Sequence, residues 1–317
     1  LPISQRNRPS VAALVRQVQE TKISDKLLTV GEFRFVLANE DLRLQHPSFP
    51  AVRRINRHAL RQMCERTSLP MTYVNRLDVN TPWRRELLAH NLNTLFENSE
   101  FGAVNRSFLF RFVGEEVFGF LTRRFNRALA SIPLLAGFLS ACEEFQAVPF
   151  SGSTNILVHN LLALRLEPFE ALPGQFMAFG MRWRHSDFGL GRVRVDACVY
   201  DLNRGTVIQL GESFSRVHLG SIIQEGDLEI SAETAAKEVD AVVSATRDAV
   251  RSGISVEAIT TYLEAIAEAS KAELTATKIR SALATILQKA ELAKVDAALE
   301  GQTTDLPPPN YSANGDV

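Results

Sequence analysis

The sequence predicts an α+β fold, in which a mixed or antiparallel curved sheet with flanking helices is followed by an α-helical C-terminal module. Between residues 180 and 220, apolar and polar residues alternate around turn signals, which is typical of β-hairpins. Between residues 56 and 96, apolar residues recur at helical spacing, and after Gly226 the composition changes to that of amphipathic helices. With 317 residues and 45% hydrophobic content, the chain is long enough to bury a sizeable core.

Four parts follow one another along the chain. They are an N-terminal helical arm (1–26), an α+β body (27–226), a helical module (227–300) and a polar, proline-rich tail (301–317). In the arm, the hydroxyl of Ser10 can cap a short helix that ends at Thr21. The body begins with two predicted strands, 27–37 and 41–45, and we expect the tail to be disordered.

A helical block follows the first two strands. Apolar spacing predicts helices over 56–66, 71–77 and 83–96, and the Ser68-Leu69-Pro70 break separates the first two. Four arginines lie along the first pair of helices: Arg57, Arg61, Arg66 and Arg76. This basic face either contacts an anionic partner or is a solvated helix face.

The second half of the body is predicted to be mainly extended. Residues 107–113 and 117–121 form a hairpin around Gly114, and a helix spans 132–144. Further extended segments are expected over 145–149, 153–166 and 176–183.

Residues 192–199 show the clearest period of two. One set of alternating residues is apolar and predicts a buried face: Val193, Val195, Ala197 and Val199. The other set begins with Arg192 and Arg194, which therefore lie on the opposite face. A turn at Asn203-Arg204-Gly205 leads to a returning strand over 207–210.

The C-terminal module contains helix start and stop signals. Ser231 caps its first helix, Glu233 lies favourably against the helix dipole, and Gly253 ends the helix. Ser255 begins a second helix, and a third is expected over 277–299. Their apolar stripes need a partner, which is either the body or another copy of the chain, so we expect self-association.

The net charge of −1 conceals a gradient along the chain. Residues 1–125 carry 19 Lys and Arg against 12 Asp and Glu, residues 126–220 carry 8 against 8, and residues 221–317 carry 8 against 16. Arginine dominates the first two segments, and its planar fork suits phosphate recognition and stacking on rings. The alternative explanation is a genome rich in G and C, which favours arginine codons.

Cysteine usage and hydropathy indicate the compartment. Cys64, Cys142 and Cys198 are far apart, with no spacing typical of a disulfide framework or a zinc site. No apolar run approaches the roughly 20 residues that span a bilayer, so we expect no membrane partner. The sequence predicts a protein of a reducing, cytoplasmic-type compartment.

No catalytic, cofactor or metal motif is evident. The six histidines have no ligand spacing. His185 and Asp187 are two residues apart and would share one face of a strand, although Asp187-Phe188-Gly189 favours a turn. We therefore predict a protein that is not an enzyme and holds no cofactor, with a hydrolase or transferase as an alternative.

Candidate nucleic-acid-binding residues combine arginines with aromatic rings. Seven arginines are expected to contact phosphate: Arg123, Arg124, Arg127, Arg182, Arg184, Arg192 and Arg194. Phe125 or Trp183 would stack on a base, as in single-strand binders. In the alternative interpretation, Phe125 belongs to the core and the arginines around it cap neighbouring elements.

Several segments together resemble the phage- and plasmid-associated domain of unknown function 932 family, over roughly residues 27–250. HALRQMCERTSLPMTYVNRL (58–77) and LAHNLN (88–93) resemble the helices near the N-terminus of that family, and 111–127 resembles its strand, turn and strand before a basic loop. HSDFGLG (185–191), with the strand that follows it and RVHLG (216–220), resembles its most recognisable portion. Where relatives carry a Cys-Thr-Asn-Gly-like turn, this chain has Leu202-Asn203-Arg204-Gly205, so no role for that cysteine carries over.

The resemblance implies a protein of a phage or other mobile element, located in the host-cell cytoplasm or in a virion. The family has no settled activity. DNA transactions fit that setting, and at the level of a curved sheet with flanking helices there is an analogy with phage single-strand annealing proteins. We therefore expect an oligomeric, non-enzymatic nucleic-acid-binding protein that binds or anneals single strands. The alternative is a phage structural or assembly protein whose C-terminal helices make the subunit contacts.

Overall fold

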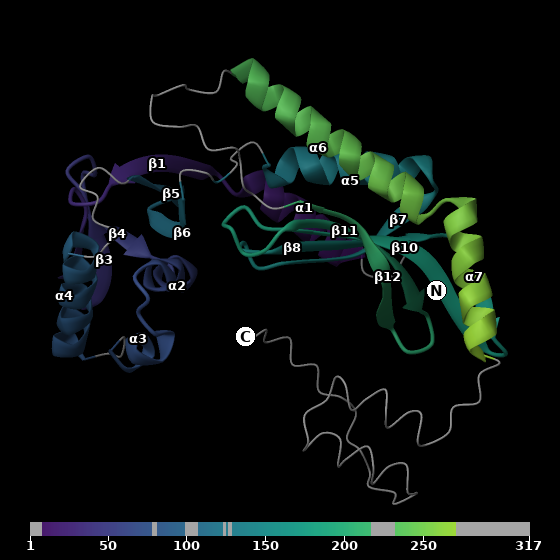
Figure 1. Ribbon diagram of the computed structural model, residues 1–317, viewed down its shortest axis with the longest axis horizontal. Helices are drawn as coiled ribbons and strands as arrows, with labels where there is room; N and C mark the ends of the chain where they lie inside the picture. Colours follow the sequence, from purple (N-terminus) through teal and green to yellow (C-terminus); the bar gives the residue numbers. More distant parts are fainter. Residues whose placement is uncertain are drawn as a thin grey trace, which may run out of the picture. The chain divides into compact units, whose positions relative to one another are not determined.

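The computed structural model describes residues 8–77, 81–98, 107–122, 125, 129–216 and 232–270 (Figure 1). Residues up to Tyr262 form one compact unit. Of the second unit, Leu263–Val317, only the C-terminal half of helix α7 (Val256–Ser270) is described. The helix expected over 277–299 and the tail expected over 301–317 lie outside the described residues. Among the helices that are described, none is long and apolar enough to cross a membrane.

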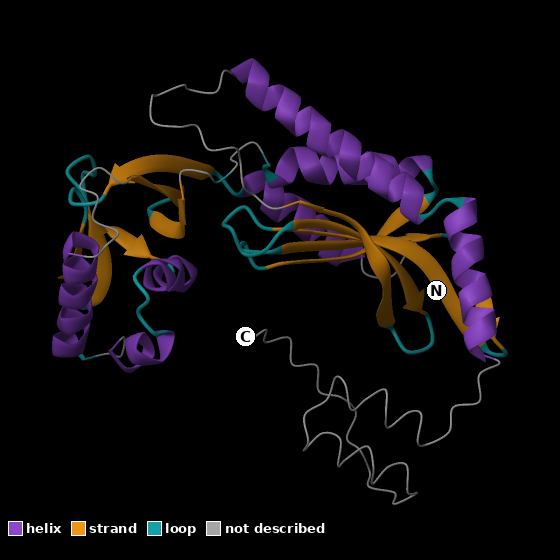
Figure 2. Ribbon diagram, viewed as in Figure 1, coloured by secondary structure: helices purple, strands orange, loops and turns teal. Residues whose placement is uncertain are grey.

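The α+β class is confirmed, and the strands form two sheets (Figure 2). The first sheet has the order β1-β5-β6-β4-β3-β2 and is mixed, because β4 runs parallel to β6 while its other pairs are antiparallel. Its strands are β1 (Ile23–Thr29), β2 (Arg34–Ala38), β3 (Asp41–Gln45), β4 (Arg53–Ile55), β5 (Ser107–Val113) and β6 (Glu116–Thr122).

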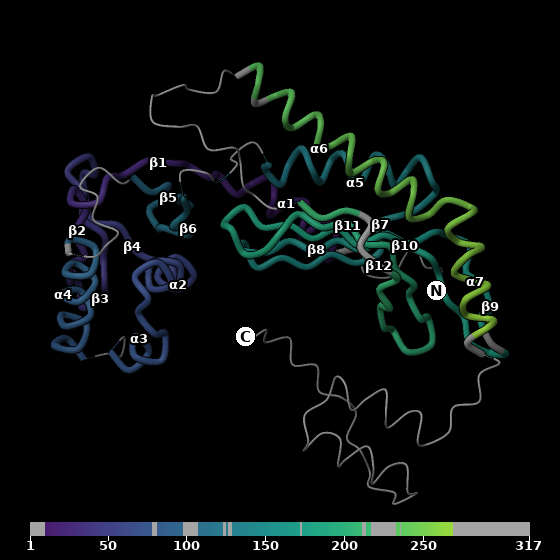
Figure 3. Tube along the Cα trace, in the orientation of Figure 1, coloured from purple at the N-terminus to yellow at the C-terminus, as the bar shows by residue number. Residues whose placement is uncertain are grey.

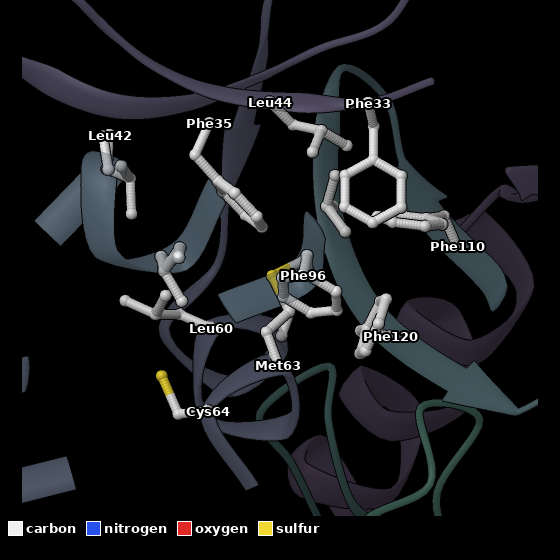
Figure 4. Packing of buried hydrophobic residues seen from close by; sticks show 14 of the residues in the cluster. Phe33, Phe35, Leu42, Leu44, Leu60, Met63, Cys64, Phe96, Phe110 and Phe120 are labelled. Carbon is white, nitrogen blue, oxygen red and sulfur yellow. The ribbon is translucent and has the colours of Figure 1, made fainter. Parts of the chain in front are cut away.

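Three helices belong to the first sheet: α2 (Arg57–Arg66), α3 (Met71–Leu77) and α4 (Pro82–Asn98). The core between them is rich in phenylalanine (Figure 4). Phe108 and Phe120 stack with ring centroids 4.5 Å apart, and Phe96 of α4 meets Phe33 edge to face at 5.4 Å. The side chain of Asn93 also bonds both the N–H and the carbonyl of Phe35 at 2.8 Å, so that α4 is fixed to β2.

The second sheet is antiparallel and has the order β12-β11-β10-β8-β7, with β9 paired to β10. Its strands are β7 (Ala147–Thr154), β8 (His159–Arg165), β9 (Phe169–Leu172), β10 (Gln175–His185), β11 (Val193–Asp201) and β12 (Thr206–Arg216). Helices α1 (Arg8–Glu20), α5 (Ser131–Glu144) and α6 (Ala232–Gly253) pack against it, and Tyr262 of α7 stacks on Phe179 of β10. Its core joins alternating residues of β10 and β11, including Trp183, Val193 and Val195, to Leu14 of α1 and Phe138 of α5.

The chain visits the second sheet first, then the first sheet, and then returns (Figure 3). Helix α1 packs on β7, and a Cβ added at Gly152 would lie 3.2 Å from the Cβ of Leu14. The next element, β1, pairs with β5 of the first sheet. The segment expected as an N-terminal arm, 1–26, therefore supplies a helix with one buried face to one sheet and the start of an edge strand to the other.

Candidate nucleic-acid interface

The predicted binding residues Arg182, Arg184 and Arg194 lie on the face of the second sheet opposite the helices. Because side chains alternate along a strand, Trp183 points toward the helices while Arg182 and Arg184 point away. Strand pairing places Arg184 directly opposite Arg194, and Arg182 directly opposite Asp196. Arg192 precedes β11 and is exposed. We call the four residues Arg182, Arg184, Arg192 and Arg194 the arginine face.

One buried carboxylate organises this surface. Asp196 is 1% exposed, and its oxygens lie 3.7 Å from Nη2 of Arg182 and 3.3 Å from Nη2 of Arg194. Both arginine side chains stay about one-third exposed, at 33% and 28%. Arg182 also donates to the side-chain oxygen of Gln209 at 3.2 Å. The carboxylate thus aligns two guanidinium groups while part of each still faces solvent.

The predicted stacking residues do not fit this role. Trp183 is fully buried, with its ring 6.5 Å from that of Phe138, because its position on β10 faces the helices. Phe125 is 8% exposed, packs with Leu109 and Leu121, and lies under the guanidinium of Arg111. Neither ring is accessible to a base, and the alternative interpretation of Phe125 as a core residue is the correct one. The remaining predicted arginines, Arg123, Arg124 and Arg127, lie outside the described residues.

Other aromatic rings are exposed: Phe176 of β10 is 46% exposed, and two further exposed rings lie on the helices of the first sheet. Trp83 at the start of α4 is 60% exposed, with the guanidinium of Arg84 5.3 Å from its ring centroid. Tyr73 of α3 is 38% exposed, and its hydroxyl accepts from Asn91 of α4 at 2.9 Å. On a helical wheel, Trp83 and Leu87 lie apart from the buried residues of α4, so helical periodicity in the sequence was a signal of their exposure.

The predicted pair of His185 and Asp187 belongs to a buried polar cluster at the end of β10. Asp187 accepts from both the backbone N–H and the hydroxyl of Ser131, at the first turn of α5. His185 Nε2 lies 3.2 Å from Asp187 Oδ1, and His159 Nε2 lies 3.8 Å from Asp187 Oδ2. Arg111 donates to the Asp187 carbonyl. We call these five residues the Asp187 junction.

Electrostatics keep Asp187 ionised. Burial alone would raise its pKa, but hydrogen bonds from His185 and Ser131 and the charge of Arg111 outweigh burial and hold the pKa well below its ordinary value. The N-terminal end of the α5 dipole favours the same charge. Burial lowers the pKa of His159, against the attraction of Asp187, so the imidazole is held neutral near pH 7.

The Asp187 junction connects elements of the two sheets. Arg111 lies on β5 of the first sheet and also forms an ion pair with Asp25 of β1 at 2.8 Å. The carbonyl of Phe188 accepts from Gln62 of α2 at 2.8 Å and lies 3.0 Å from His58 Nε2. These contacts give the HSDFG segment (185–189) a structural role, because it connects elements of both sheets.

The Asp187 junction lacks the arrangement of a catalytic triad. In a triad the histidine lies between the nucleophile and the carboxylate, whereas Ser131 here donates directly to Asp187. Ser131, His159, His185 and Asp187 are all at most 5% exposed. Substrate therefore has no access to these groups in this conformation.

The cysteines and the metal-ligating residue types are further candidates for reactive sites among the described residues. All three cysteines are free and buried, and burial raises the pKa of Cys64 and of Cys198 to about 12, so these thiols stay protonated. Burial raises the pKa of Cys142 as well. Within the described ranges, no group of three or more His, Cys, Asp or Glu residues is placed to hold a metal ion.

Comparison of the chain with protein-family models, curated proteins and solved structures finds no match. The resemblance to the domain of unknown function 932 family therefore stays a prediction.

Proposed function

We propose that this protein binds nucleic acid through its phosphate backbone at the arginine face. The observation that supports the proposal is the strand register that gathers Arg182, Arg184 and Arg194 on neighbouring strands, with the carboxylate of Asp196 within ion-pair distance of Arg182 and Arg194. Arg192, just before β11, adds a fourth, exposed arginine beside them. Clustered guanidinium groups attract a polyanion, and guanidinium forks match phosphate oxygens.

Local hydrogen-bonding groups fit the same ligand. Strand pairing places Asn160 of β8 beside Arg184, and its amide lies 3.4 Å from the hydroxyl of Ser153. Amide and hydroxyl groups are common donors to phosphate and carry no base preference. Because Trp183 is buried, binding at this surface would depend on charge and hydrogen bonds, so it should be strongly sensitive to salt.

The test uses the two exposed members of the arginine face, Arg184 and Arg192, whose replacement leaves the pairs of Asp196 intact. Fluorescence anisotropy would follow binding of a labelled single-stranded DNA from low to physiological salt. For R184Q/R192Q we expect weaker binding and a salt slope, log K against log salt, that is smaller by about 1.4, because each lost phosphate contact on a single strand contributes about 0.7.

The matched control is R66Q/R76Q, which removes the same charge from exposed positions on α2 and α3. Equal losses in both double variants would show only a general charge effect and would overturn the assignment to the arginine face. Absence of binding by the wild-type chain at low salt would overturn the function itself. Light scattering on the same samples would test the expected self-association.

A further inference from the structure

A small cavity of about 150 Å³ opens at the other sheet, beside the ends of β3 and β4. The elements that line it are β3, β4, β6, α2 and α4. Its charged lining residues are Arg43, Arg54, Arg85, Asp41 and Glu116. This volume holds a few water molecules or one small ion, and it is below the size of a typical pocket for a larger organic ligand.

The cavity brings together three guanidinium groups from three elements. Strand pairing places Arg43 of β3 directly opposite Arg54 of β4. Like charges opposite each other in a sheet repel, so this pairing is unfavourable unless an anion compensates it. Arg85 approaches from α4, where it donates to the Glu40 carbonyl and pairs with Asp41 at 3.2 Å.

The carboxylates only partly neutralise these arginines. Asp41 is shared, since it lies 3.2 Å from Arg43 as well as from Arg85. Glu116 is paired with Arg54 by strand register, but its nearest described polar contact is the amide of Asn56, at 3.5 Å. No carboxylate among the described residues lies within ion-pair distance of Arg54. Two acids thus face three arginines.

Burial strengthens the electrostatic effect of two of the three arginines. The side chains of Arg43 and Arg85 are only 15% and 16% exposed, so solvent screens their charges less than on an open surface. The Nε of Arg43 is buried and donates no hydrogen bond within the described part of the chain. Buried donors of this kind are rare in folded proteins and call for an acceptor. An oxyanion would supply both the acceptor and the missing negative charge.

The site is also preorganised. Asn39 and Glu40 both adopt positive φ, 52° and 64°, which is the conformation of a tight hairpin turn between β2 and β3. This conformation is unfavourable for glutamate, and the bond from Arg85 to the Glu40 carbonyl stabilises it. The same bond fixes the Arg85 guanidinium at the cavity before any ligand binds.

We propose that this cavity binds a phosphate-type oxyanion through Arg43, Arg54 and Arg85. The site belongs to the first sheet and does not depend on the arginine face of the second. The phosphate could belong to a small phosphorylated molecule or to the end of a nucleic-acid strand. Both sources present the same tetrahedral group to the three guanidinium forks.

The experiment is isothermal titration of the full chain with inorganic phosphate at constant ionic strength. We expect saturable one-to-one binding to the wild type and binding at least tenfold weaker to R54Q. Arg54 is exposed, so this substitution should not disturb folding. R57Q is the matched control, because Arg57 is an exposed arginine nearby in sequence that does not line the cavity. R54K would retain the charge but lose the fork, and should bind with intermediate affinity.

Two results would overturn the proposal: no saturable phosphate binding to the wild type, or equal weakening in R54Q and R57Q. Competition then identifies the source of the phosphate. If phosphate displaces a 5′-phosphorylated oligonucleotide but not its 5′-hydroxyl counterpart, the cavity binds strand ends. If it displaces neither, the cavity binds a free phosphorylated molecule. Failure of this site leaves the R184Q/R192Q result unaffected, so the two proposals can fail separately.

Discussion

Asp187 and Asp196 are both buried carboxylates of the second sheet, but their surroundings differ in kind. Asp187 is 5% exposed and is held by groups fixed in the fold: a helix N-terminus, a serine hydroxyl and a buried histidine. Asp196 is 1% exposed, and its partners are two long arginine side chains that remain partly in solvent. The partners of Asp187 are all fixed inside the fold. The arginine partners of Asp196, in contrast, remain able to contact a ligand.

The largest effect should come from removing the charge of Asp187. D187N keeps the shape of the side chain but weakens its bonds to Ser131 and His185. Breaking a buried charged network by changing one partner costs about 3 kcal/mol. We expect urea denaturation to show a loss of that size in the free energy of unfolding. D240N on the exposed surface of α6 should change it by less than about 0.5 kcal/mol, and similar small changes in both variants would contradict this role.

The second effect is a loss of stability at acid pH, which arises from titratable groups of the Asp187 junction. Because burial lowers the pKa of His159, the unfolded chain takes up a proton at higher pH than the folded chain does. Stability therefore falls as the pH drops below about 6.5, by up to about 1.4 kcal/mol per pH unit for one histidine. The depressed pKa of Asp187 acts in the same direction at lower pH, because its contribution is present above the ordinary carboxyl pKa and is lost on acidification.

Urea denaturation of H159Q between pH 7.5 and 5.5 measures how much of this pH dependence of stability comes from His159. Its stability should depend less on pH than that of the wild type. The pKa of His58 is also lowered by burial, so some dependence should persist. H90Q, at an exposed position of α4, serves as the control and should match the wild-type slope. An unchanged slope in H159Q would show that this histidine does not titrate with unfolding.

The smallest expected effect comes from removing the charge of Asp196. If the arginine face binds phosphate, D196N removes a competing negative charge and should raise affinity for single-stranded DNA about fivefold at low salt, close to 1 kcal/mol. The same change should lower stability, because it leaves Arg182 and Arg194 without their carboxylate. Fluorescence anisotropy tests the expected rise in DNA affinity, and denaturation of the same sample tests the expected loss of stability. Lower affinity would instead show that Asp196 acts mainly by orienting the arginines.

Elements with strong local patterns were predictable from the sequence. The bounds expected for 41–45, 71–77 and 107–113 agree with β3, α3 and β5. The short strands β4 and β9 were not predicted, because three or four residues are too few to show a period. The single strand expected over 27–37 is wrong, because a turn after Thr29 divides this range between β1 and β2. Strand β1 also begins earlier than expected, at Ile23, since the polar residue Asp25 looks unsuited to a strand until Arg111 is seen beside it.

The candidate site was predictable only in part. Alternation along 192–199 correctly placed Arg194 opposite the buried valines. The same alternation, applied to 182–184, places Trp183 with the buried set and so argues against stacking. An aromatic beside arginines has the composition of a nucleic-acid site, but composition does not state which way a ring points.

The sequence by itself determined the α+β class, most of the elements and the face on which each alternating residue lies, because side-chain direction repeats every two residues in a strand and every 3.6 in a helix. The tertiary structure alone decided the division into two sheets, the pairing of Arg111 with Asp25 and the position of Asp187 at the start of α5. It also decided that Arg43, Arg54 and Arg85 share one cavity. Such contacts join residues far apart in the chain, and local periodicity carries no information about which distant charges will meet.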